Sequence, residues 1–328
     1  MKLERETVKY LIGAAALTFI LYQVDLLYAV FTVPLHVLAL KRKDSVVYYA
    51  AAVAAFAITI QEFIRFSGYG AGSQDGLIVA IAVFGPVSLF AGTLLYYASE
   101  NRGLRRLYRF LISLSAAGVL GLLITVLFEG DSAAAVHARD SMREQFSLLM
   151  SIGQQSGIGG MFSAEQADMF FNLTVETVKR SFLLGIALQL GVSIQIAMLI
   201  FSRLSGKRER WIASFHVPEQ FLWPFLVSWT VVLVSLLTDI GPAGVIGWNV
   251  ALLTGFVYFL QGCAILLVLL QKKGIRISAS LIVMLLLLLL LIPGVNALFM
   301  LGVPLLGISE IWIQYRVVNK ENTDENNS

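Results

Sequence analysis

Several polar side chains interrupt stretches that are otherwise long and apolar enough to cross a membrane. They are Asn249, Tyr258, Gln261 and Asn296 toward the C-terminus, and Asp25 near the N-terminus. A polar group that faces lipid is costly unless it finds a hydrogen-bond partner, so such side chains are expected to turn inward. Mostly uncharged hydrogen-bonding groups of this kind suit an uncharged or zwitterionic ligand. We therefore take these five residues as candidate substrate-binding residues.

The acids in the apolar segments each allow two interpretations. Asp25 within a span would be costly and would indicate function, whereas a broken helix there would bring water close to it. Glu62 and Arg65 lie three residues apart at the end of an apolar run. That spacing is typical of an ion pair at a helix end, although a functional site is the alternative.

Motifs of the common catalytic and metal sites are missing from the sequence. It has no G-x-x-x-x-G-K-[ST], no H-E-x-x-H and no G-x-S-x-G, and its three histidines are scattered. Its single cysteine, Cys263, lies in an apolar run and is expected to pack as a small hydrophobe. We therefore expect no catalytic residue, no metal site, no cofactor and no enzymatic activity. The net charge of +3 is too small to indicate a nucleic-acid partner.

The composition places the chain in the lipid bilayer. Of its 328 residues, 58% are hydrophobic and only 14% are charged, whereas a soluble domain carries about 25% charged residues. The sequence predicts an all-α fold, a polytopic transmembrane helical bundle of about 8–10 spans. The predicted spans are a broken pair within 10–40, followed by 44–64, 78–98, 106–128, 181–203, 220–240, 247–271, 278–292 and 294–315.

Basic residues orient these spans. They cluster at 41–43, 102–109, 203–210, 272–276 and 316–320. The positive-inside rule assigns these clusters and both termini to the cytoplasm, and places the segment 129–178 outside a cytoplasmic membrane. That segment has two stretches with mixed apolar and charged faces at helical spacing. The expected organisation is N-terminal transmembrane helices (1–128), an extracytoplasmic amphipathic segment (129–180), C-terminal transmembrane helices (181–316) and a disordered polar tail (317–328).

Three sequence stretches resemble one family. They are FHVPEQFLWPFLVSW, GFVYFLQG followed by LLQKKGI, and LLGISEIWIQYR. Together they are similar to the YybS-like bacterial integral membrane proteins, domain of unknown function 2232. The resemblance implies that Pro218, Glu310 and Arg316 are family-motif residues. Family members often carry a second acid where this chain has Gln314, so a site that requires both acids is not expected here.

The resemblance also implies a fold and a functional class. The family is distantly similar to the substrate-capture components of energy-coupling-factor transporters, which depend on separate ATPase and coupling subunits. The missing P-loop agrees with a small-molecule-binding or transport subunit that lacks its own ATPase. The alternative is a non-transporting scaffold or assembly partner in the cell envelope, which would act through the external segment and the basic loops.

Overall fold

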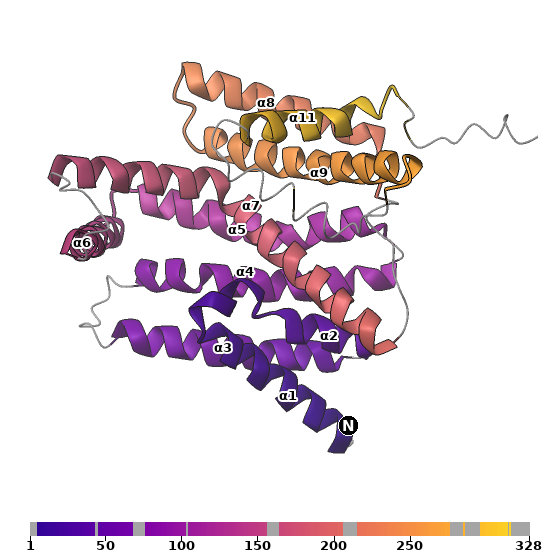
Figure 1. Cartoon of the computed structure of the whole chain (residues 1–328). Helices are drawn as coiled ribbons and strands as arrows, with labels where there is room; N and C mark the ends of the chain where they lie inside the picture. Colours follow the sequence, from indigo (N-terminus) through magenta and orange to yellow (C-terminus); the bar gives the residue numbers. More distant parts are fainter. Residues whose placement is uncertain are drawn as a thin grey trace, which may run out of the picture. The chain divides into compact units, whose positions relative to one another are not determined.

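The structure is a computed structural model that describes residues 5–42, 45–67, 76–102, 104–155, 164–205, 215–275, 285, 296–313 and 315. Every regular element in these residues is a helix (Figure 1), which confirms the predicted all-α class. The helices are α1 (Arg5–Tyr22), η1 (Asp25–Val30), α2 (Val33–Lys41), α3 (Val46–Ser67), α4 (Gly76–Ala98), η2 (Glu100–Arg102), α5 (Arg106–Glu129), α6 (Ala133–Gln155), α7 (Ala164–Ser205), η3 (Glu219–Phe221), α8 (Leu222–Leu237), α9 (Pro242–Lys272) and α11 (Asn296–Ser309).

Six helices within the described residues are long and apolar enough to cross a membrane. They are Val46–Arg65, Gly76–Ala98, Arg106–Glu129, Glu165–Leu204, Glu219–Leu237 and Pro242–Lys272. This confirms a polytopic bundle. The stretch predicted as a broken pair contains α1, η1 and α2, and α11 occupies the last predicted span. The predicted span 278–292, Arg316 and the tail 317–328 lie outside the described residues, apart from residue 285.

The chain forms two compact units. The first contains Met1–Lys207 with Asp239–Asn249, and the second contains Arg208–Thr238 with Val250–Ser328. The described residues of the predicted extracytoplasmic segment, 129–180, form the end of α5, α6 and the first turns of α7, and they belong to the first unit.

The segment between α1 and α3 is a broken helix, made of η1 and α2. Helix α2 has 9 residues, so it is about 14 Å long and covers only half of a hydrocarbon core of about 30 Å. The 3-10 helix η1 precedes it, and the junction residues Phe31 and Thr32 are buried. At this interruption the side-chain amide of Gln189, on α7, donates to the backbone oxygen of Tyr28 at 2.7 Å.

Helix α6 lies across the bundle of the first unit. In Figure 1 it is seen almost along its axis, whereas α3, α4 and α5 run across the view. Ala135 and Ala138 of α6 are fully buried against Leu77 of α4 and Phe128 of α5. Arg139 donates to the backbone oxygens of Phe128 and Gly130, which caps the C-terminal end of α5. An amphipathic helix in this direction, at the ends of spanning helices, suits the membrane surface.

Two glycines let α9 and α11 approach closely in the second unit. A Cβ atom added at Gly307 would lie 2.1 Å from the backbone oxygen of Tyr258, and one at Gly262 would lie 2.0 Å from that of Val303. Next to this crossing, buried Phe259, Cys263, Leu267 and Val303 pack together. Cys263 therefore packs as a small hydrophobe, as predicted. Close approach between small residues is how membrane helices gain packing contacts in lipid.

The substitution Gly307→Ala should destabilise this crossing, because the added methyl group meets backbone rather than a movable side chain. We expect a cost of about 1–3 kcal/mol, measured as a lower midpoint of thermal unfolding in detergent. Gly302→Ala is the matched control on the same helix, since a Cβ there has no neighbour within 4 Å. Equal midpoints for the two variants would contradict the close crossing.

Candidate functional site

The amide of Asn249 is fully used by the protein backbone. Its oxygen accepts from the backbone N–H of Leu183 at 2.9 Å. Its nitrogen donates to the backbone oxygens of Lys179 at 2.7 Å and Val245 at 2.9 Å. All three bonds lie within the first unit, and Asn249 is 3% exposed.

These bonds place Asn249 inside the hydrogen-bond ladder of α7. Lys179 and Leu183 are four residues apart, and an undisturbed α-helix pairs that carbonyl directly with that N–H. The Asn249 amide also bonds to both of these groups. A side chain that inserts into the ladder is a recognised cause of helix bending. Figure 1 shows that α7 changes direction along its length.

Gln261 links three segments of the second unit. Its oxygen accepts from the backbone N–H of Val217 at 2.8 Å. Its nitrogen donates to the backbone oxygen of Gly307 at 3.0 Å and to the carboxylate of Glu310 at 2.9 Å. At the end of α11, the backbone N–H of Ile311 bonds to the carbonyl of Ile308 rather than to that of Gly307. Gln261 therefore supplies a hydrogen-bond donor to the Gly307 carbonyl. Glu310, which the resemblance implies to be a motif residue, is thus joined to α9.

The other predicted site residues lie in different surroundings. Tyr258 is fully buried against the rings of Phe221 and Phe225, at 6.1 and 5.4 Å between centroids. Its hydroxyl has no hydrogen-bond partner among the described residues. Asp25 is exposed at the start of η1.

Two further predicted residues stand at helix starts. Pro218 precedes η3 as its N-cap. Asn296 begins α11, and its side chain lies outside the described residues. The five predicted binding residues belong to two units. Among all the residues singled out from the sequence, the structure joins Gln261 directly to Glu310.

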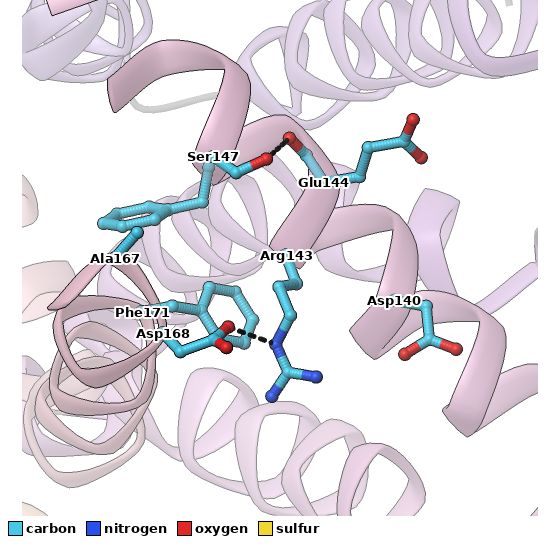
Figure 2. A pocket seen from close by; sticks show the side chains of 8 residues that line it. Asp140, Arg143, Glu144, Ser147, Ala167, Asp168 and Phe171 are labelled. Carbon is cyan, nitrogen blue, oxygen red and sulfur yellow. Dashed lines mark hydrogen bonds and ion pairs between the residues drawn. The ribbon is translucent and has the colours of Figure 1, made fainter. Parts of the chain in front are cut away.

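A cavity of about 370 Å³ lies between α6 and the first turns of α7 (Figure 2). Arg143 Nε lies 3.0 Å from Asp168 Oδ1, and its guanidinium lies 5.4 Å from the centre of the Phe171 ring. Phe146 meets Phe171 edge to face at 5.8 Å. The lining residues are Asp140, Arg143, Glu144, Phe146, Ser147, Ala167, Asp168 and Phe171.

The charges of this cavity are suited to a ligand that carries both signs. Figure 2 shows Arg143 and Asp168 facing each other, with Asp140 and Glu144 on the other side of Arg143. Both partners of the ion pair are about half exposed, so the pair contributes little to stability and its groups can exchange partners. The sequence contains a signal for the α6 wall of this cavity, because residues 140, 143, 144 and 147 are polar and recur at helical spacing.

Among the described residues, no group of three His, Cys, Asp or Glu side chains is arranged to hold a metal ion. The fold and the cavity together describe an all-helical, polytopic membrane protein that has a charged cavity between α6 and α7. A family model described as a predicted membrane protein (DUF2232) matches residues 14–304, so the chain belongs to this family. Neither a curated protein nor a solved structure matches the chain.

Replacing Gln261 by Leu should destabilise the protein in the absence of any ligand. The change leaves the Val217 N–H, the Gly307 carbonyl and the Glu310 carboxylate without this partner, at an expected total cost of about 3 kcal/mol. Thermal unfolding in detergent measures it. Gln271→Leu is the matched control, because Gln271 is exposed on the same helix. Wild-type stability of the Gln261 variant, with loss of a bound ligand instead, would contradict the structural role.

Proposed function

We propose that this protein is a small-molecule-binding subunit of a transport system, and that it captures its ligand in the α6–α7 cavity. The observation that carries this proposal is the cavity itself. Its volume of about 370 Å³ falls within the roughly 300–1,000 Å³ typical of small-molecule sites. Its lining combines two aromatic rings with charged groups of both signs.

The chemistry of the lining favours a zwitterionic ligand of amino-acid type. The guanidinium of Arg143 provides a planar, two-pronged donor for a carboxylate. The carboxylates of Asp140, Glu144 and Asp168 provide acceptors for an ammonium group. Phe146 and Phe171 supply apolar surface for the body of the ligand. A ligand carboxylate would take the place of Asp168 at Arg143.

This proposal differs from the sequence-based one in the position of the site. The amides of Asn249 and Gln261 are bonded to the protein itself, so they are poor candidates for ligand contacts. The charged groups of Arg143 and Asp168, on α6 and α7, are about half exposed and line a cavity.

The resemblance to substrate-capture components of energy-coupling-factor transporters supports the transport class. On that basis the protein is not an enzyme, and separate ATPase and coupling subunits are its partners. It resides in the cytoplasmic membrane with the C-terminus inside and the α6–α7 cavity on the outer side, as the distribution of basic residues indicates.

The alternative function, a scaffold or assembly partner, is favoured by apolar side chains exposed on the same two helices. Those on α6 are 54–67% exposed and those on α7 are 41–61% exposed. They are Leu148, Leu149 and Ile152 on α6, and Met169, Phe170 and Leu173 on α7. A helical partner with an apolar face would cover such a surface.

Arg143→Gln and Asp168→Asn test the capture site. With protein in lipid nanodiscs and a panel of the common amino acids, native mass spectrometry should find ligands that bind the wild type. Each variant should weaken that binding at least tenfold, because each removes one side of the charge complementarity. Glu165→Gln is the control, since Glu165 starts the same helix but does not line the cavity. Binding that survives both cavity changes places the site elsewhere.

Replacing Leu149 and Ile152 together by Ser tests the scaffold function. These changes should reduce recovery of a co-purifying envelope protein several-fold, because they remove apolar contact area, and should leave amino-acid binding intact. Quantitative mass spectrometry of the purified complexes measures this. Arg143→Gln serves as the control, and unchanged partner recovery with the double variant would contradict docking on α6.

A further inference from the structure

Glu62 is a buried acid near one end of a membrane-spanning helix. It belongs to the span Val46–Arg65 and is 4% exposed. The hydroxyl of Tyr22, at the end of α1, donates to Glu62 Oε1 at 2.9 Å. Arg65, which the spacing predicts as its ion-pair partner, is exposed. No ion pair joins Glu62 to any residue within the described ranges.

The cation nearest to Glu62 along α3 is Arg65, one turn further on, whose charge also acts on Tyr22. From α1 it meets Tyr22, and Tyr28 of η1 lies against Tyr22 with 5.5 Å between ring centroids. Helix α4, which packs on α3, has no charged residue between Gly76 and Ala98. On α2 the charged residue is Lys41, in the last turn beyond His36. A buried carboxylate with one neutral donor is costly, so this group is suited to gaining a positive charge.

A second hydroxyl, a buried one, lies near Tyr22 on α1. Thr18 lies one turn before Tyr22 on α1 and is fully buried. Its hydroxyl has no hydrogen-bond partner among the described residues. Helical side chains lean toward the helix N-terminus, so the Tyr22 side chain extends over the turn that carries Thr18. Next in sequence to Tyr22 and Glu62, the amides of Gln23 and Gln61 bond to each other at 2.5 and 2.8 Å.

We infer that Glu62, with the hydroxyls of Tyr22 and Thr18, forms a binding site for one monovalent cation, either an alkali ion such as Na⁺ or a proton. Carboxylate, phenol and hydroxyl oxygens are ligands that hard cations prefer. One carboxylate and one monovalent cation are together neutral, whereas a divalent ion would leave a net charge in the membrane. The site is separate from the α6–α7 cavity and does not depend on what that cavity binds.

The orientation of the chain gives this site access from outside. The basic clusters place the start of α3 in the cytoplasm, so Glu62, four turns further on, lies toward the outer surface. The Gln23–Gln61 amide pair is exposed and lies one residue beyond Tyr22 and one before Glu62. In this orientation Arg65, one turn beyond Glu62, lies closer to the outer surface, and Gln61 lies at about the depth of Glu62.

The experiment has two arms, each with wild-type protein, Glu62→Gln and Asp25→Asn in lipid nanodiscs. The first arm compares thermal unfolding in NaCl with that in choline chloride at equal ionic strength and pH 8. The second arm records infrared spectra between pH 5 and 9 without Na⁺, in the C=O stretching region of protonated carboxyl groups. Glutamine keeps an acceptor oxygen for Tyr22, so Glu62→Gln is expected to fold. Asp25→Asn removes an exposed acid nearby and is the matched control.

A Na⁺ site predicts that saturating NaCl raises the wild-type midpoint by roughly 5 °C, that Glu62→Gln abolishes the rise and that Asp25→Asn retains it. A proton site predicts no effect of Na⁺ but a pH-dependent carboxyl band that disappears in Glu62→Gln and remains in Asp25→Asn. The inference is overturned if neither signal appears in the wild type, or if the signal that appears persists in Glu62→Gln.

Discussion

The structure depends on one constraint, which is that every backbone polar group freed inside a membrane must find a partner within the chain. At the interruption between η1 and α2, Gln189 bonds to the backbone oxygen of Tyr28. Asn249, on α9, bonds to the backbone oxygen of Lys179 and the backbone N–H of Leu183 on α7. At the end of α11, Gln261 bonds to the Gly307 carbonyl. Each of these sites uses a single amide, because an amide donates and accepts from one side chain.

This use of amides changes how polar residues in spans are interpreted. A buried Asn or Gln is often taken as a ligand contact, yet its donors and acceptor can be consumed by backbone groups. A buried carboxylate is different, since it only accepts hydrogen bonds and retains a charge to be neutralised. By this criterion Glu62 indicates binding more strongly than Asn249 or Gln261, although the sequence alone favours the amides.

The sequence predicts the helical class and the spans because hydropathy depends on residues that are adjacent in the chain. It also predicts that Cys263 packs as a hydrophobe. It does not predict the partners of Asn249 on α7, because these are backbone groups 66 and 70 residues away. The spacing of Glu62 and Arg65 permits an ion pair, but Tyr22 meets the carboxylate from another helix. The α6 wall of the cavity could have been predicted from the sequence, since its residues recur at helical spacing.

Helix α7 has a mechanical consequence for the first unit. With 42 residues it is about 63 Å long, roughly twice the thickness of the hydrocarbon core. One uninterrupted backbone therefore carries both a wall of the cavity and a membrane span. A tilt at the cavity end is not dissipated in a flexible loop. It is passed along the helix toward the span, and Asn249 holds α7 at Lys179 and Leu183, between the two.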